Sequence, residues 1–150
     1  MPKLTDYAAL LTRFNSILRQ LTDLLIEDDP INPDNTVIKI TFYFDSGFYG
    51  ETQLRVREWF DKNDNKIQYR YSWEKNRKKP GHISAWENEY HFVPHHMLPE
   101  GLKSDPHHHH HVPGDRAQLQ DNWTIRDLES VLTVVEEFIR ENKPYDSKML

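Results

Sequence analysis

The sequence predicts an α+β fold, organised as a single domain over residues 1–150. Apolar residues recur at three- and four-residue steps near both ends of the chain, which is typical of amphipathic helices. Between them, apolar and polar residues alternate with a period of two, which is typical of half-buried strands. We therefore expect an N-terminal helix, an antiparallel meander of three to four strands, a long loop rich in His and Pro, and a C-terminal helix packed on the sheet.

The first predicted helix spans residues 4–27. Its apolar stripe comprises Leu4, Tyr7, Ala8, Leu11, Phe14, Leu18, Leu21 and Leu25. Thr5 and Asp6 suit a helix N-terminus, and Asp28-Asp29-Pro30 ends the helix because the residue before proline disfavours helical geometry. A stripe of this length is typical of a core face or of an oligomer seam, and in the second case it would support a homodimer through helix 4–27.

The sheet is predicted over residues 36–92. Residues 36–44, 50–60 and 66–74 alternate with period two, and residues 83–92 could add a fourth strand. The turn residues Asn63-Asp64-Asn65 indicate a hairpin between the second and third segments. This hairpin would bring Arg55 and Arg57 near Arg70 on one face.

After the sheet, residues 93–122 show little periodicity and predict a loop of about thirty residues, a length that usually marks a functional or disordered segment. A second helix is predicted over residues 124–142, opened by Thr124. Its apolar stripe comprises Leu128, Val131, Leu132, Val135, Phe138 and Ile139.

Histidine is the most unusual feature of the composition. Seven of the nine histidines lie between His95 and His111, and five of them are consecutive. The net charge of −5 with neutral histidines argues against a generic basic nucleic-acid binder, and the lack of cysteine excludes disulfides and thiolate chemistry. Since no apolar run approaches the length of a membrane span, we expect a cytoplasmic protein without membrane contact.

Three motifs occur in a fixed order along the chain. They are Tyr69-Arg70-Tyr71-Ser72-Trp73; Trp86-Glu87-Asn88 with Val93-Pro94-His95-His96; and Asp105-Pro106 followed by His107 to His111. Over roughly residues 50–140 this order resembles the TumE-type toxins of prokaryotic toxin–antitoxin pairs, with Glu87 where the family has Asp. The resemblance implies a toxin that acts on RNA as a small ribonuclease and is neutralised by an antitoxin encoded beside it.

Cleaving RNA without a metal requires a base for the 2′-hydroxyl proton, an acid for the leaving oxygen and cations for the developing phosphate charge. We predict as catalytic residues His95, His96, His108, His110 and Arg70. As RNA-binding residues we predict Arg55 and Arg57 for the phosphate, Tyr69 and Tyr71 for base stacking, and Arg77, Lys78 and Lys79 for backbone phosphates. The enzyme would then be a metal-independent endoribonuclease without a cofactor.

Other interpretations of the same residues remain open. Tyr69, Tyr71 and Trp73 lie on the apolar side of their strand and could be core residues, and the arginines could form a solvated sheet face. The chain could instead be a non-catalytic protein-binding module with a metal- or pH-responsive His-rich loop. Alternating His107, His109 and His111 could bind Zn²⁺ or Ni²⁺ adventitiously, or serve a metal-dependent hydrolase.

Overall fold

The computed structural model describes residues 6–18, 20–21, 24–75, 81–88, 109–112, 115–121 and 127–145. Helix α1 (Tyr7–Arg13) is followed by the short strands β1 (Gln20–Leu21) and β2 (Leu25–Asp28). The central strands are β3 (Thr36–Phe44), β4 (Thr52–Phe60), β5 (Lys66–Lys75) and β6 (His82–Glu87). Strands β7 (His109–Val112) and β8 (Asp115–Asp121) precede helix α2 (Leu128–Glu141).

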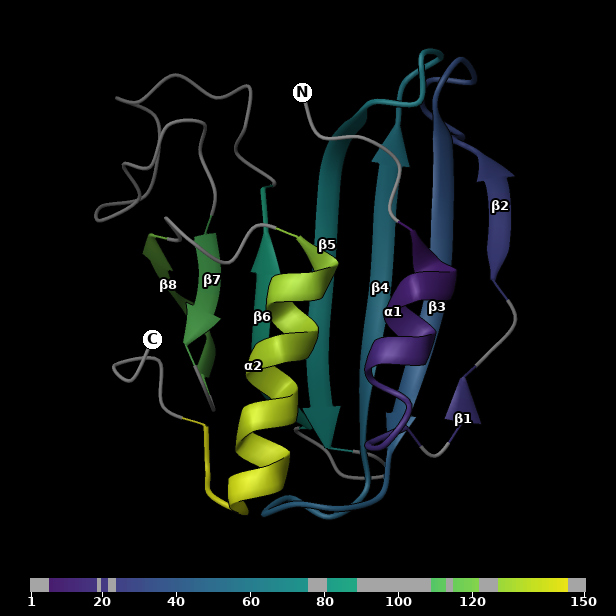
Figure 1. Ribbon diagram of the computed structural model, residues 1–150. Helices are drawn as coiled ribbons and strands as arrows, with labels where there is room; N and C mark the ends of the chain where they lie inside the picture. The colour runs from purple at the N-terminus through teal and green to yellow at the C-terminus, as the bar shows by residue number, and fades with distance from the viewer. Residues whose placement is uncertain are drawn as a thin grey trace.

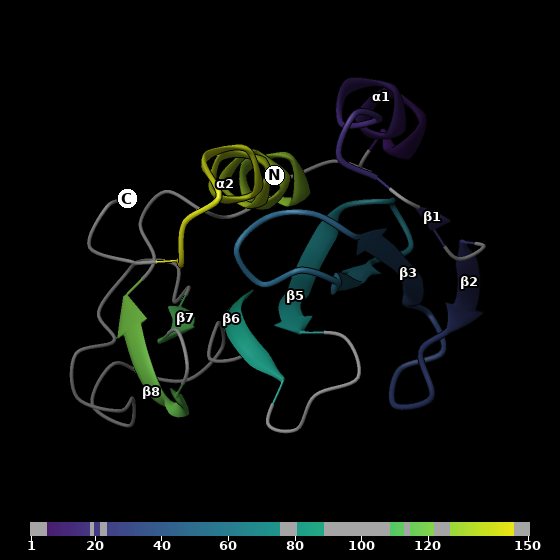
Figure 2. The same cartoon turned by 90° about the horizontal axis from the view of Figure 1, so that it is seen from below.

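The described strands form one antiparallel sheet of eight strands, in which β3 to β8 are adjacent in chain order and both β1 and β2 pair with β3. Figures 1 and 2 show both helices on the same face of this sheet, with α2 in front of β5 and β6 and α1 in front of β3 and β4. The predicted α+β class, with the C-terminal helix packed on the sheet, is confirmed.

The predicted helix 4–27 is wrong in extent. Helix α1 ends at Arg13, and the following chain returns to the sheet, where Gln20–Leu21 and Leu25–Asp28 pair with β3. Leucine favours a helix by local propensity, but tertiary context overrides this preference here. Pairing with β3 satisfies backbone groups that a long helix would leave unpaired at this sheet edge. Of the predicted stripe, Phe14 is buried in the core and Tyr7, Leu11 and Leu18 are partly buried against it, whereas Ala8 and Leu25 are exposed. Leu10 and Ile17, which the predicted stripe did not include, are also core residues.

The predicted sheet 36–92 and loop 93–122 also need correction. Strands β7 and β8 lie within the segment predicted as a loop, and they extend the sheet beyond the expected three to four strands. Their sequences, HHHV and DRAQLQD, contain no regular apolar alternation. The alternation that predicts a strand from sequence is therefore missing here, and these strands are stabilised by pairing with β6 and with each other.

Helix α2 begins later than the predicted helix 124–142. Asp127 is its N-cap, and the Oδ1 atom of Asp127 accepts a hydrogen bond of 2.7 Å from the backbone N–H of Ser130. The helix ends at Glu141, and its C-cap Asn142 adopts the left-handed conformation with φ 54°. Both Asp127 and Thr124 are good N-cap residues, so local sequence alone did not decide between them.

The core lies between the helices and the sheet. It is closed beyond α2 by Tyr145, whose ring makes edge contacts with Phe138, Trp73 and Trp86 at centroid distances of 5.0, 6.1 and 5.8 Å. The backbone N–H of Tyr145 donates to the hydroxyl of Tyr49 at 2.8 Å. Among the described residues, neither helix has the length and apolar character needed to cross a membrane.

The turn between β3 and β4 limits substitution at one glycine. Gly47 has φ +97°, and a Cβ there would lie 3.0 Å from the Cα of Ile139 in α2. Gly50 has φ +69° but open space around it. We expect Gly47→Ala to lower the free energy of unfolding by about 2 kcal/mol or more, and Gly50→Ala by about 1 kcal/mol, because only the first adds a clash to the backbone strain. Urea denaturation measures both, and equal losses would contradict the close packing of this turn on α2.

Candidate functional site

The sheet face opposite the helices carries the polar positions of the central strands. On β4 and β5, Arg55, Arg57, Arg70 and Ser72 share this face, because their strand neighbours are buried beneath the helices. The cross-strand register arranges the positions into two rows that run perpendicular to the strands. The first row contains Lys39, Arg57, Arg70, Glu87 and His109, and the second contains Thr41, Arg55, Ser72, Ala85 and His111.

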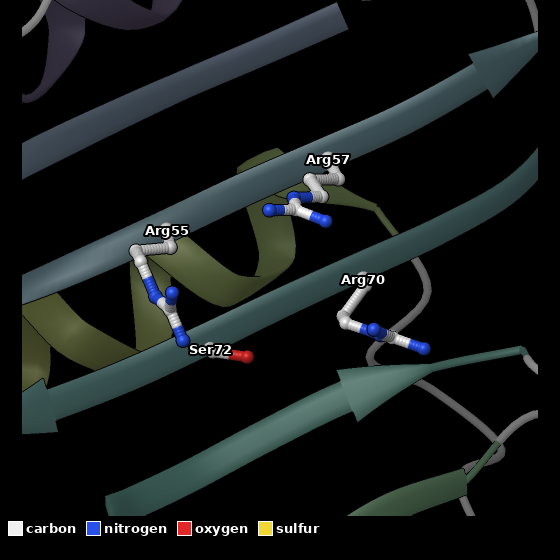
Figure 3. A pocket seen from close by; sticks show the side chains of 4 residues that line it. All are labelled: Arg55, Arg57, Arg70 and Ser72. Atoms are coloured by element: carbon white, nitrogen blue, oxygen red, sulfur yellow. The ribbon is translucent and has the colours of Figure 1, made fainter. Parts of the chain in front are cut away.

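Arg55, Arg57, Arg70 and Ser72 line a hollow of about 170 Å³. Figure 3 shows the four side chains on the open side of β4 and β5, with α2 behind the sheet. Arg57 and Arg70 are directly opposite each other in register. Like charges in this position destabilise a strand pair, so sheet stability does not account for the arrangement. The prediction that the hairpin gathers these arginines on one face is confirmed.

Two of the three guanidinium groups are held by carboxylates. Arg55 Nη2 lies 2.7 Å from Glu74 Oε1, and Arg70 Nε lies 2.7 Å from Glu87 Oε2. Glu87 is buried, so it holds the Arg70 side chain in one orientation with a charge-assisted hydrogen bond. The Arg55 pair is more exposed and therefore weaker.

Arg57 differs from its neighbours. It is exposed, and it makes no ion pair with any carboxylate in the part of the chain that the structure describes. The charge of its guanidinium is therefore not compensated by a described carboxylate, and its hydrogen-bond donors are available to an external anion. The hollow is suited to a phosphate or carboxylate group, which would reduce the repulsion between Arg57 and Arg70.

The residues of the Trp86-Glu87-Asn88 motif have three different environments, and two of them act on Arg70 or on the backbone before it. Trp86 is buried in the core beneath the helices, and the buried Glu87 carboxylate binds Arg70. Asn88 Oδ1 accepts a hydrogen bond of 2.8 Å from the backbone N–H of Tyr69, and Asn88 Nδ2 donates to the carbonyl of Ile67 at 3.2 Å. Asn88 thus fixes the backbone of β5 immediately before Arg70.

Sequence analysis missed a buried charged cluster on the helix side of the same strands. Glu58 is 0% exposed, and its Oε2 accepts hydrogen bonds from the Tyr71 hydroxyl at 2.5 Å and from Lys66 Nζ at 3.2 Å. The hydroxyl of Tyr7 in α1 donates to Oε1 of the same carboxylate. Burial, and then the adjacent Glu58 charge, raise the pKa of the Tyr71 hydroxyl well above its usual range.

Lys66 enters this cluster because of a β-bulge. Trp59 pairs with Gln68 and Phe60 pairs with Lys66, so Ile67 is the extra residue on β5. Strict alternation would place Lys66 on the face of Arg70, and the bulge moves it to the core side. Since the cluster is closed to solvent, its role is to fix the packing of α1, β4 and β5.

The predicted stacking residues Tyr69 and Tyr71 lie on the helix-covered face. Tyr69 and Tyr71 are 2% and 0% exposed, and their rings stack on each other with centroids 4.9 Å apart. No base can reach these rings. Tyr69 and Tyr71 are therefore core residues and not the base-stacking residues that the sequence predicted. Trp73 is likewise buried.

The predicted histidines are placed only in part. His109, His110 and His111 belong to β7, where the backbone register pairs His109 with Glu87, His110 with Trp86 and His111 with Ala85. Seven of the predicted site residues lie outside the described residues. They are His95, His96, His107, His108, Arg77, Lys78 and Lys79.

No group of three or more metal-ligating side chains occurs among the residues whose side chains the structure describes. The side chains of His107, His109 and His111 lie outside this set, so their predicted adventitious binding of Zn²⁺ or Ni²⁺ stays a prediction.

Lys39 is a site residue that sequence analysis did not name. It lies beside Arg57 in the first row and pairs with Glu27 at 2.9 Å. Together with Leu25, Thr41, Arg55 and Arg57 it lines a second hollow of about 410 Å³. The alternation in residues 36–44 already placed Lys39 on the polar face, so extending the predicted hairpin by one strand would have found it.

Comparison with protein families identifies a model described as Toxin TumE, which matches residues 10–143. Comparisons with curated proteins and with solved structures found no match.

The buried cluster leads to a prediction about stability. Glu58→Leu should lower the free energy of unfolding by about 3 kcal/mol or more, because Lys66 is left as a buried charge without its carboxylate. The double variant Glu58→Leu/Lys66→Met should recover part of this loss. As a surface control, Glu27→Gln removes the partner of Lys39 and should change stability by about 1 kcal/mol or less. Denaturant titration measures all three, and a double variant less stable than Glu58→Leu would contradict the pairing.

Proposed function

This chain belongs to the TumE family of toxins, and from that premise we propose that it acts on RNA as a small ribonuclease. The three arginines bind the phosphate, and histidines serve as general acid and base. Family membership also implies a cognate antitoxin as the partner that neutralises the chain.

The arginine hollow is the observation that supports this proposal. A phosphodiester needs several hydrogen-bond donors with positive charge around one point, and guanidinium groups supply both. Arg70 is oriented by Glu87, whereas Arg57 lacks an ion-pair partner in the described part of the chain. Ser72 adds a hydroxyl at the same hollow. The site therefore combines a pre-oriented cation with an available one.

We assign general acid and base chemistry to His95, His96, His108 and His110. In the backbone register His110 is opposite Trp86, outside the row of Arg57 and Arg70. The row that contains Arg57, Arg70 and Glu87 continues to the backbone position of His109 on β7. Neighbouring strands are about 5 Å apart, so β7 lies about 10 Å from β5. This proximity supports a His-rich strand as one side of the active site, and it adds His109 to the candidates.

A non-catalytic binding module is the alternative function, and an RNA-cleavage assay separates the two. The exposed edge strand β2, with Leu25 and Ile26 52% and 65% exposed, favours protein contact at that edge. A homodimer through residues 4–27 has less support, because Leu10, Phe14 and Ile17 lie in the core.

Arg57→Gln tests the phosphate site. We expect that expression of this variant no longer arrests growth and that the variant binds single-stranded RNA at least tenfold more weakly. The slope of log affinity against log salt concentration should decrease by the equivalent of about one phosphate contact. Its melting temperature should remain within about 2 °C of the parent, because the side chain is exposed and has no described ion-pair partner. Lys62→Gln in the β4–β5 turn removes the same charge at an exposed position and is the control. Equal binding by both variants would reject the hollow as the phosphate site.

The histidine mechanism is tested by pH and by chelation. His96→Ala should lower the rate of RNA cleavage by about 10²–10⁴-fold. The parent should show a bell-shaped rate profile with limbs around pH 6–7, as a pair of imidazoles produces. Addition of EDTA should leave the rate unchanged if catalysis is independent of metal. Loss of cleavage with EDTA and its recovery with Zn²⁺ would favour a metal-dependent hydrolase instead.

A further inference from the structure

We propose that Trp59 is a base-stacking platform beside the arginine hollow, so that the ligand of this face is single-stranded RNA. This inference rests on the proposed function, because it takes the anion in the hollow to be an RNA phosphate. It assigns the stacking role to a residue on the open face, after Tyr69 and Tyr71 proved to be core residues.

Trp59 occupies the right position for a base attached to a phosphate at Arg57. The two residues are separated by one residue on β4, so their side chains share a face and their Cα atoms lie about 7 Å apart. A base is separated from its own phosphate by one ribose, which is a comparable distance. Trp59 is partly exposed, whereas Trp73 and Trp86 are buried on the helix side.

The neighbours of Trp59 hold it in the sheet and leave part of it exposed. In register, Trp59 is directly opposite Val37 on β3 and Gln68 on β5. Val37 is buried although it shares the open face, and an aromatic side chain opposite a β-branched one stabilises antiparallel pairing. The indole is thus anchored in the sheet while part of its ring remains exposed to a ligand.

Charge favours the Trp59 side of the hollow over the opposite side. The row beyond Arg55 contains Tyr43, Gln53 and Glu74. The Glu74 carboxylate already binds Arg55, so it offsets the positive charge on this side of the hollow. The row beyond Arg57 contains Val37, Trp59 and Gln68, none of which carries a charge. An RNA chain whose phosphate lies at Arg57 is therefore better accommodated if it continues towards Trp59 than if it continues towards Tyr43.

Stacking on Trp59 requires an unpaired base, because both faces of a paired base are occupied within the helix of a duplex. The described part of this face therefore selects single-stranded RNA. The selectivity would come from the aromatic face and the phosphate, and it would tolerate different bases.

The test uses the full chain and a short oligouridylate with 2′-O-methyl groups, which a 2′-hydroxyl-dependent ribonuclease cannot cleave. Fluorescence anisotropy measures its affinity for the parent and for Trp59→Ala, Trp59→Phe and Tyr43→Ala. We expect Trp59→Ala to weaken binding by about ten- to a hundredfold, as loss of one stacked base does. Trp59→Phe should retain most of the affinity, and Tyr43→Ala should change it by less than about threefold.

Intrinsic fluorescence provides a readout that a merely structural role of Trp59 would not give. The unlabelled oligonucleotide should quench tryptophan emission of the parent, and Trp59→Phe should remove most of this quenching. Equal affinity for a duplex of the same length, or parent-like affinity of Trp59→Ala, overturns the stacking proposal. If Arg57→Gln still loses binding in that case, the phosphate site stands without the stacking subsite. If neither substitution affects binding, the proposed function fails as well.

Discussion

The register between β4 and β5 determines which side chains face the helices and which form the hollow. Side chains alternate along each strand, so a slip by one residue would bring Arg55 and Arg57 under the helices and expose Leu54 and Val56. Such a slip would bury two guanidinium groups among apolar side chains, which is costly for a charged group. The position of the candidate site is therefore a consequence of this one strand pairing.

Several polar contacts hold that register in addition to apolar packing. The carboxylate of Glu58 binds side chains from β5 and from α1, and these contacts form only in the observed alignment. The Asn88 side chain binds the backbone of β5 at Ile67, which is the bulge residue, and at Tyr69. At the hairpin itself, Asp61 Oδ1 accepts the backbone N–H groups of Asn63 and Asn65 at 2.9 and 3.0 Å. A buried polar network of this kind specifies one arrangement, because every alternative leaves its members unsatisfied.

The two described helices cover the same face of the sheet (Figures 1 and 2), and this arrangement links the stability of the fold to the proposed chemistry. The helices bury the aromatic side of β5, and the opposite side keeps its arginines on rigid strands at fixed spacing. A site on paired strands is positioned more accurately than one on a loop, and this benefits phosphate binding by more than one guanidinium. The neighbouring strand β6 presents Glu87 to Arg70, so the cation is oriented before any ligand arrives.

The sequence by itself determined the alternation of the central strands, the α+β class and the common face of Arg55, Arg57 and Arg70, because a period of two is a local property of the chain. It could not determine that leucine-rich residues 20–28 form edge strands, or that His109 to Val112 pair with β6, because those strands depend on partners distant in sequence. It also left the stacking residues undecided, since accessibility depends on which face the helices cover. Only the tertiary structure revealed the bulge at Ile67. The bulge adds one residue to β5 and thereby places Lys66 on the core side.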